Sequence, residues 1–535
     1  MLYHHRFYFF SWLCLAALLY GGIAIPEFSL LAQSPKEEQI FRYNAGSEPE
    51  SLDPAVISGT SEIQLCTSLF EGLLCQDAST LKVMPAVATH WNISENGTCY
   101  TFFLRESRWS DGTSLTAQDF YRSWQRVLEP KTGAPYASQL FPILGAEAYN
   151  AGGEKDFKNV GLRVINPHCF EVTLHHPCPY FLDLCAFVAL FPVPLKVVEK
   201  YGDRWVRPEN FVSNGPFSLQ AWLPRKELIL VPNLHYYDKN SIKLSRIEAK
   251  LIDDHDTAYK LFLQKELDWI THVPLPKIDE AKWNPAYYAS PYIGNYFYRF
   301  NTTRKPFDDK RVRRALSMSV YRQALTRQVL KGGEQAAAFF CPALGSYQPI
   351  EGLSYNPQEA NRLLDECGYK DRSTFPETEI FYNTSEAHKK IAETIADQWS
   401  NSLGISVRLR NSEWKVFLQT MAELNFEICR SSWIGDYEDP NTFFDLFKSN
   451  GGNNRTGWSN ANYDELLNQS QRELDPQRRN HLFQRMERLL VEDECPIMPL
   501  YIYVNKGMIS PRVAGWYENL RDIHPLKSIY IEKPR

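Results

Sequence analysis

An acidic cluster follows an apolar segment near the C-terminal end of the chain, in the stretch NFEICRSSWIGDYEDPNTFF at residues 425–444. Asp436, Glu438 and Asp439 come shortly after Arg430 and Trp433. Carboxylates at this spacing suit three kinds of chemistry: a pair of catalytic acids, a metal site, or an anchor for a ligand with a positive charge. Which of these applies depends on the elements that position the cluster.

The segment before the cluster predicts alternating strands and helices. They are a strand at 378–383, a helix at 386–404, a strand at 405–411, a helix at 413–424 and a strand at 426–433. The first helix has apolar residues at a spacing of four and ends at Gly404. Such alternation predicts a parallel sheet with right-handed crossovers, in which ligands bind beyond the carboxyl ends of the strands. We therefore expect Asn383 and the Arg430–Asp436 segment to lie at a ligand crevice.

The composition is that of a large globular protein. The chain has 535 residues, of which 44% are hydrophobic and 23% charged. A chain of this length suggests about three to five structural units. The net charge of −5 gives no basic surface for nucleic acid. The aromatic content of 14% is typical of proteins that build binding clefts.

The N-terminus predicts export. After Arg6 the segment Phe7–Ile25 has no charged residue, and Ala32 offers a cleavage point. Residues 1–32 are therefore expected to be a signal peptide, or an uncleaved N-terminal membrane anchor because the apolar run is long. The cysteines after this segment form no CxxC pair, which argues against a zinc ribbon, and their disulfide pairing cannot be read from spacing.

The three chemistries are not equally supported by motifs. The chain has no nucleophile elbow, phosphate loop, HExxH motif or dinucleotide fingerprint, and almost any acidic loop could supply two carboxylates. DYEDPN lacks the glycine and the distal glutamate of a calcium loop, and His175, His176 and Cys178 are better explained as a loop between strands. For Asp436, an anchor role and a turn or helix-capping role are equally consistent with the residues.

Motifs distributed along the chain resemble those of one family. They include GSEPESLDP, SLFEGLL, LRESRWSDGTSLTAQDFYRSWQRV, SNGPF, PFDDKRVRRALSMSV, YNTSEAHKK, EWKVFLQT and WIGDYEDP. Together they are similar to the periplasmic oligopeptide-binding proteins of bacterial peptide ABC transporters, within family 5 of the solute-binding proteins. The resemblance implies an α/β fold of the type II periplasmic-binding-protein class, with two lobes and an extra domain, so that three domains surround a hinged cleft.

The resemblance also implies where the domains lie. Domain I, in the first lobe, would comprise residues 36–70, 195–292 and 504–535. Domain II, the extra domain of that lobe, would comprise residues 71–194, and domain III, the second lobe, residues 293–503. The chain would then pass between the lobes more than once and form a hinge that closes on a ligand.

The function implied by this family is transport rather than catalysis. The chain would be a periplasmic solute-binding protein, a monomer without a metal or another cofactor and with no nucleic-acid partner. It would capture peptides of about two to five residues and deliver them to the membrane subunits of an ABC permease. A binder of nickel, haem or a murein-type peptide with the same fold is the alternative, and a glycosidase-like hydrolase is a more distant one.

The resemblance assigns roles to individual residues. Ser58–Thr60 and Ser432–Ile434 would pair with the backbone of an extended peptide, and Asp436 would hold its α-amine. The groups implied to meet the peptide carboxylate are Arg430, Arg304 and His388. The residues implied to form the walls of the cleft and its pockets are Tyr136, Tyr292, Asn383, Trp414 and Trp433.

Two residues depart from the family pattern. Ser58 stands where relatives can have a pocket glutamate, and Met421 stands where an additional arginine can occur. Both changes remove charge from the implied cleft. We therefore expect backbone capture to be retained, whereas the preferred peptide length and side chains can differ.

Overall fold

The computed structural model describes residues 38–532. From Gln39 onward the chain forms one compact unit. The predicted signal peptide or anchor at residues 1–32 lies outside the described residues. Within the described part, no helix combines the length and the apolar character needed to cross a membrane. The cysteines at positions 66–495 are all free, so the described chain contains no disulfide.

The main sheet has eleven strands and contains both parallel and antiparallel pairs. Ten of its strands follow one another in the order β10 (Phe217–Leu223), β11 (Glu227–Pro232), β12 (Arg246–Lys250), β1 (Ile40–Asn44), β13 (Trp269–Ile270), β19 (Ile497–Ile509), β14 (Tyr287–Phe300), β18 (Ile428–Ile434), β16 (Thr378–Asn383) and β17 (Val407–Ser412). The eleventh strand, β15 (Gln335–Ala336), pairs with β19. Near one end β1 is parallel to β12 and β13, and at the other end β16 is parallel to β17 and β18.

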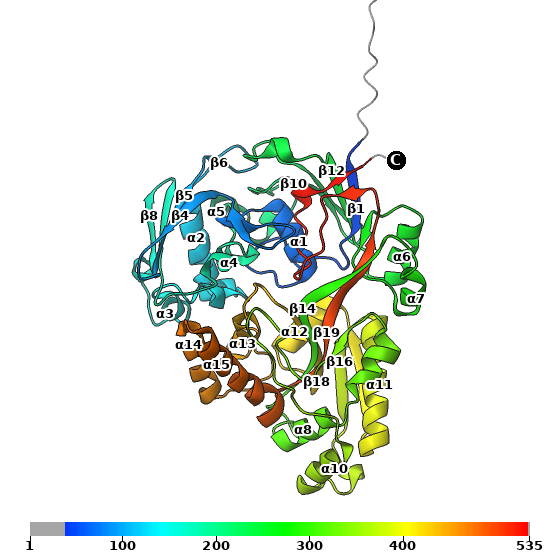
Figure 1. The fold of residues 1–535 in the computed structure, drawn as a ribbon. Helices are drawn as coiled ribbons and strands as arrows, with labels where there is room; N and C mark the ends of the chain where they lie inside the picture. Colours follow the sequence, from blue (N-terminus) through cyan, green and yellow to red (C-terminus); the bar gives the residue numbers. More distant parts are fainter. Residues whose placement is uncertain (1–37, 533–535) are drawn as a thin grey trace, which may run out of the picture. The chain divides into compact units, whose positions relative to one another are not determined.

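The long antiparallel pair β14–β19 joins these two parts of the sheet (Figure 1). Residues 287–291 pair with residues 504–508, and residues 295–299 pair with residues 497–502. The register shifts between Pro291 and Asn295, so an irregular segment connects the two halves of the pair. The shift coincides with the predicted boundary between domains I and III, although the three-domain division itself stays a prediction.

A second sheet contains four strands, in the order β4 (Ala88–Ile93), β5 (Cys99–Leu104), β9 (Cys169–Thr173) and β8 (Leu162–Asn166). Helix α2 (Ala117–Leu128) packs against it, with the rings of Trp124 and Phe170 in edge contact at 5.3 Å. Thr116 and Asp119 form a capping box at the start of this helix. The short strands are β2 (Leu74–Gln76), β3 (Val83–Pro85), β6 (Ser107–Arg108), β7 (Ser114–Leu115), β20 (Val513–Ala514) and β21 (Tyr530–Ile531).

Helices flank both parts of the main sheet and build separate apolar cores. The remaining helices are α1 (Thr60–Leu69), α3 (Ala146–Asn150), α4 (Phe181–Cys185), α5 (Leu195–Tyr201), α6 (His255–Leu263), α7 (Ile278–Ala281), α8 (Lys310–Met318), α9 (Arg322–Ala324), α10 (Pro357–Glu366), α11 (Glu386–Leu403), α12 (Trp414–Ala422), α13 (Asn441–Phe444), α14 (Ala461–Arg472) and α15 (Pro476–Arg488). One core lies under β1, β12 and α1 and extends to α2, and another joins β14, β16, α8 and α11. The two cores correspond to the two ends of the sheet.

The strand–helix alternation predicted before the acidic cluster is confirmed. The elements β16, α11, β17, α12 and β18 begin and end within two residues of the predicted positions. Ile391, Ile395 and Trp399 of α11 are buried, and Gly404 ends the helix with a φ of 70°, a conformation that glycine adopts without strain. The local sequence pattern was sufficient to predict these elements, because the apolar spacing, the helix caps and the turns all indicate the same boundaries.

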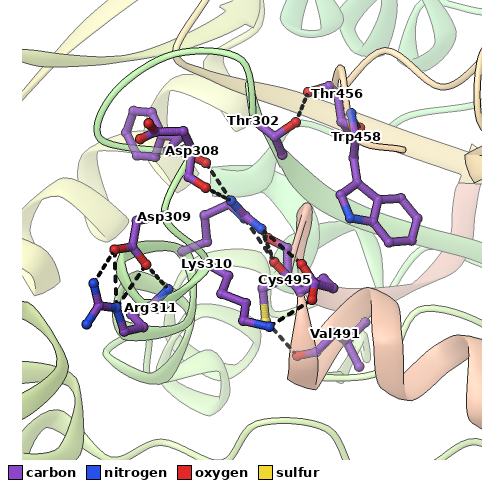
Figure 2. Close-up of polar contacts among 12 residues, drawn as sticks. Thr302, Asp308, Asp309, Lys310, Arg311, Thr456, Trp458, Val491 and Cys495 are labelled. Atoms are coloured by element: carbon purple, nitrogen blue, oxygen red, sulfur yellow. Dashed lines mark hydrogen bonds and ion pairs between the residues drawn. The ribbon is translucent and has the colours of Figure 1, made fainter. Parts of the chain in front are cut away.

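The PFDDKRVRRAL motif, which carries part of the family resemblance, builds the fold rather than a site. Asp309 caps α8 by accepting a hydrogen bond from the backbone N–H of Arg311 at 2.8 Å (Figure 2). Lys310 Nζ lies 2.9 Å from a carboxylate oxygen of Glu494, on the segment that leads into β19. The motif thereby fastens α8 to the chain beside the central strand pair.

Arg313 is the buried centre of this network, with 2% of its surface exposed. Its guanidinium donates hydrogen bonds to the backbone carbonyls of Phe307, Asp308, Glu494 and Cys495. We expect Arg313→Met to lower the free energy of unfolding by roughly 2–4 kcal/mol, because several buried carbonyls lose their donors. Urea unfolding followed by circular dichroism measures this loss.

Arg311→Met is the matched control for that experiment. Arg311 is an exposed arginine of the same helix, and among residues 38–532 its side chain pairs only with Asp309. Its removal should change stability much less than the removal of Arg313, because exposed ion pairs contribute little. Equal losses in the two variants would show that the carbonyl network is not what stabilises this region.

Candidate functional site

The candidate site begins at an unpaired edge of β18. On one side β18 pairs with β14 along its whole length, from Ile428 to Ile434. On the other side β16 pairs only with Ile428 and Cys429. A Cβ atom at Gly294 would collide with the Ile434 side chain, so glycine permits the close approach of β14 to β18 there. Residues 430–434, which include the predicted Ser432 and Ile434, therefore present backbone groups without a strand partner.

Asp436 lies just beyond this strand and is buried, with 6% of its surface exposed. Its backbone N–H donates to Thr442 Oγ1 at 2.9 Å, whereas its Oδ2 has no hydrogen-bond partner among the described residues. Burial raises the pKa of Asp436 to about 7, although Arg521 and Thr442 act in the opposite direction. A carboxylate left unpaired in this way is ready to receive a cation.

Arg521 is a site residue that the sequence did not reveal. It is buried beside Asp436, and its Nε donates to the carbonyl of Gly435 at 3.1 Å. Its Nη1 has no partner among the described residues, and burial lowers its pKa despite the nearby charge of Asp436. Arg521 stands in an irregular loop with no flanking motif, so no local pattern could have identified it.

Aromatic side chains surround the Asp436 end of the site. Trp433 Nε1 donates to the carbonyl of Thr442 at 2.6 Å, which holds the indole in place. The ring of Tyr136 lies 6.4 Å from that of Trp433, and the charge of Asp436 adds to the effect of burial in raising the pKa of Tyr136. The structure thus brings Tyr136, Trp433 and Asp436 together, as the resemblance implied.

Arg430 forms the other end of the unpaired edge. It is 8% exposed, donates to Asn383 Oδ1 at 3.3 Å and to the Tyr503 hydroxyl at 3.1 Å, and covers the ring of Tyr296 at 4.9 Å. The Tyr296 hydroxyl is 3.2 Å from Nδ1 of His388. Within residues 38–532 the guanidinium has no carboxylate partner, and its Nε has no hydrogen-bond acceptor. Arg430, Asn383 and His388 are therefore close together, as expected.

The remaining predicted residues make their contacts with residues other than Asp436 and Arg430. Tyr292 packs edge-on against Tyr503 at 6.1 Å, in the irregular segment of β14. Trp414 is the first residue of α12 and stacks on Phe417 at 5.9 Å. Ser58 and Thr60 lie at the start of α1, and in the described part of the chain no hydrogen bond joins them to β18.

Arg304 is separated from the other predicted cationic residues. It lies 3.7 Å from Glu427 and 3.3 Å from Asn425, at the beginning of β18 rather than at its end. The structure therefore does not bring Arg304 to Asp436. It leaves Arg304 beyond Arg430, on the side away from the acidic cluster.

The other acids of the cluster are either paired or exposed. Asp439 accepts hydrogen bonds from Arg479 at 2.5 and 2.8 Å and from the backbone N–H of Asn441 at 2.9 Å. Glu438 is exposed. Across residues 38–532 no group of three or more His, Cys, Asp or Glu side chains could hold a metal ion. Of the three chemistries, the geometry supports a charged anchor at Asp436.

Comparisons with known proteins identify the family of the chain. The family model of the bacterial extracellular solute-binding proteins, family 5 Middle, matches residues 82–455. The periplasmic murein peptide-binding protein MppA of Escherichia coli (strain K12) is 35% identical over 522 residues, covering 95% of this chain and 95% of its own. A solved structure of the periplasmic oligopeptide-binding protein OppAIV from Borrelia burgdorferi has a TM-score of 0.89 and 34% identity, covering 92% of this chain and 100% of that one.

Two solved structures of MppA bear on the arrangement of the chain. One has a TM-score of 0.90 at 35% identity and covers 93% of this chain and 99% of its own. The form described as unliganded and open has a TM-score of only 0.64 at 35% identity, and it covers 92% of this chain and 98% of its own. The elements of the present structure are therefore arranged differently from those of that open form.

The raised pKa of Asp436 predicts how this residue affects stability. An ordinary aspartate ionises near pH 4 in the unfolded chain, whereas in the folded protein ionisation is delayed to about pH 7. The folded state thus binds the proton more tightly, so stability falls as the pH rises from about 4 to 7. We expect Asp436→Asn to raise the melting temperature of the ligand-free protein, with a larger gain at pH 8 than at pH 5. The corresponding gain in the free energy of unfolding is at most about 4 kcal/mol.

Asp439→Asn is the control, because Asp439 is paired with half-buried Arg479. This variant should lower the melting temperature at both pH values, since it leaves the guanidinium without its counter-ion. Differential scanning calorimetry of protein stripped of ligand makes the comparison. A pH-independent gain, or a loss, for Asp436→Asn would show that its carboxylate is satisfied in the folded state.

Proposed function

Because the chain belongs to the bacterial extracellular solute-binding proteins of family 5, we propose that it captures short peptides in the periplasm and delivers them to an ABC permease. Relatives named for murein peptides and oligopeptides support this class of ligand. The observation that carries the proposal is the unpaired edge of β18 between Asp436 and Arg430. Among the described residues, Asp436 Oδ2 and Arg430 Nε have no hydrogen-bond partner, although the charge of Arg521 lies near Asp436. A free peptide has matching groups: an ammonium, a strand of amides and a carboxylate.

Backbone pairing gives affinity without dependence on side chains. An extended peptide can add to β18 as a strand, with Ser432 and Ile434 supplying hydrogen-bonding groups. We assign the opposite side of the peptide to Ser58–Thr60, as the family resemblance implies. The β18 edge provides main-chain contacts that every peptide can use.

The spacing of the charges favours short ligands. Asp436 is six positions after Arg430, so their Cα atoms are at most about 20 Å apart in extended chain. The two side chains take up part of this span, and a peptide rises at most about 3.3–3.6 Å per residue. Peptides of about three or four residues therefore fit between the two charges. Arg304, beyond Arg430, would meet only longer peptides.

The other predicted residues would line the cleft between these charges. Asn383 and His388 accompany Arg430 at the carboxylate end, and Tyr136, Trp433 and Tyr292 surround the amine end. Trp414, near the end of β16, would form a side-chain pocket. Pockets that retain water can accept different side chains, because ordered water adapts its hydrogen bonds to each.

A hydrolase is less well supported by the same geometry. A glycosidase needs two carboxylates free to act on one bond. Asp439 is held by Arg479 and Glu438 is exposed, so neither of these two acids is poised to act together with Asp436. We therefore assign no catalytic residue and no cofactor, and we propose that the protein acts as a monomer.

The anchor role of Asp436 is tested by combining a variant with a modified ligand. Removing one partner of a buried charge pair costs about 3–5 kcal/mol, because the other charge remains buried and alone. Asp436→Asn should therefore weaken binding of Ala-Ala-Ala by about two to three orders of magnitude. N-acetyl-Ala-Ala-Ala should bind the unmodified protein as poorly.

Isothermal titration calorimetry of all four combinations completes this test. The two losses should not add, since each breaks the same interaction. Asp439→Asn serves as the matched acidic variant and should leave the preference for a free amine in place. If acetylated and free peptides bind the unmodified protein equally well, Asp436 is a structural residue.

Side-chain tolerance is a separate consequence of backbone capture. Tripeptides that differ only in uncharged side chains should bind within about tenfold, equivalent to about 1.4 kcal/mol. Competition against one labelled tripeptide would rank a panel such as Ala-Ala-Ala, Ala-Phe-Ala and Ala-Leu-Ala. A spread of a thousandfold would show that specific pockets, rather than the β18 edge, dominate affinity.

A further inference from the structure

A loop at residues 519–524, between β20 and β21, is bonded to both central strands of the main sheet. The carbonyl of Leu520 accepts a hydrogen bond at 2.9 Å from the N–H of Ile293, in the irregular stretch of β14. The side chain of Asp522 accepts one at 2.5 Å from the side-chain amide of Asn505 on β19. We call residues 519–524 the junction loop, because they lie beside the stretch where the register of β14 and β19 shifts.

The junction loop is fastened to the part of the molecule that contains α1. The side chain of Asn519 donates to the carbonyl of Ala78 at 3.1 Å, and the carbonyl of His524 accepts from the side chain of Gln64 on α1 at 2.7 Å. The side-chain oxygen of Asn519 also accepts from the N–H of Arg521 at 3.1 Å. These bonds fix the backbone from which the Arg521 side chain extends.

Arg521 joins this loop to the segment that carries Asp436. Its Nε donates to the carbonyl of Gly435 at 3.1 Å, while the N–H of Gly435 donates to the carbonyl of Ile293 at 2.8 Å. Because Ile293 is bonded to Leu520 in turn, these contacts close a ring between the junction loop, β14 and the Asp436 segment. Gly435 follows β18, so the bond from Arg521 connects the two parts of the main sheet. It exists only while the junction loop and the end of β18 lie together.

Arg521 also neutralises Asp436. Its charge acts on the Asp436 carboxylate, and its own side chain is buried, with 8% of the residue exposed. An ionised carboxylate is costly to bury alone, and a guanidinium beside it offsets this cost. The other ionisable groups around the two residues are acids and phenols: Asp183 on α4, Tyr136, Tyr292 on β14, Glu438 and Asp445. A second guanidinium, that of Arg455, acts on Tyr136.

The guanidinium of Arg521 has room to move away from Asp436. Its Nη1 has no partner within residues 38–532, and the side chain lines a cavity of about 60 Å³ together with Glu71. Glu71 is buried, and its Oε2 likewise has no partner in the described chain. An ammonium that reaches Asp436 repels the guanidinium. The arginine then has both space and a free carboxylate oxygen on the side of the cavity.

We propose that Arg521 is a positioning residue that replaces the ligand's ammonium at Asp436 and so allows the ligand-free protein to adopt the closed arrangement. Closed here means the arrangement in which Arg521 contacts Gly435. The inference rests on the proposed peptide function and adds a control of closure to it. Without a ligand, Arg521 offsets the buried charge of Asp436. With a peptide bound, the ammonium neutralises Asp436 instead, and Arg521 shifts toward Glu71.

Small-angle X-ray scattering of ligand-free variants measures the ratio of closed to open protein. At pH 8, Arg521→Met should lower this ratio about tenfold and increase the radius of gyration, because closure then buries Asp436 without a counter-ion. Arg521→Lys keeps the positive charge and should lower the ratio less. Arg512→Met removes an exposed arginine near the same end of the chain and should leave the ratio unchanged. An unchanged ratio in Arg521→Met overturns the proposal.

The charge of Asp436 distinguishes neutralisation from a merely structural role of Arg521. Burial raises the pKa of Asp436 to about 7, so at pH 5 it is protonated in the closed arrangement and the difference between Arg521→Met and the unmodified protein should disappear. Adding Asp436→Asn to Arg521→Met should restore the ratio at pH 8 to within about threefold of that of the unmodified protein, since no buried charge remains. A fall that is equal at both pH values and persists in the double variant overturns the proposal.

Ala-Ala-Ala separates this inference from the proposed function. Saturating peptide should bring Arg521→Met to the radius of gyration of the peptide-bound unmodified protein, because the ammonium then neutralises Asp436. If calorimetry shows no binding of the peptide to the unmodified protein, the proposed function fails, whereas the ligand-free comparisons still decide the role of Arg521. If the peptide binds to Arg521→Met and the variant stays as open as before, the proposal is overturned.

Discussion

The antiparallel pairing of β14 with β19 is the interaction on which the rest of the structure depends. These strands are the only connection, within the main sheet of the described chain, between the part containing β1 and β12 and the part containing β16 and β18. Their register shifts between Pro291 and Asn295 and again between Tyr296 and Phe297, so the paired segments are joined by an irregular stretch. A strand pair built in this way connects the two cores and can still bend at its irregular stretch, as hinges that close on a ligand do.

The candidate site contains polar groups that lack partners in the folded protein. A strand edge without a partner and a buried carboxylate at Asp436 are both unfavourable in a folded protein. The structure compensates by fixing their surroundings: Trp433 is bonded to Thr442, Arg521 to Gly435, and Arg479 to Asp439. The unsatisfied groups are therefore held in place, and a ligand that supplies their missing partners gains affinity without first ordering the site.

The motifs that reveal the family include segments that build the fold as well as segments that form the site. Asp309 and Arg313 of the PFDDKRVRRAL motif cap α8 and satisfy backbone carbonyls, which is why they form a recognisable pattern. Arg521, in contrast, contacts Gly435 from a part of the chain far from the acidic cluster and belongs to no pattern. Arg304, implied by the resemblance to meet the carboxylate of some ligands, lies at the far end of β18 from Asp436, and its role stays a prediction.

The sequence by itself determined the local elements and the family. The boundaries of β16, α11 and β18 follow from apolar periodicity and from Gly404, because these signals act over a few residues. It also placed Asp436 beyond a strand end, but it left open whether that carboxylate was satisfied by a turn. Only the tertiary structure decided this, since the burial of Asp436, its neighbour Arg521 and the missing strand beside Ser432 all depend on segments distant in sequence. Electrostatic and packing interactions join residues that are distant in sequence, so a local sequence pattern cannot predict them.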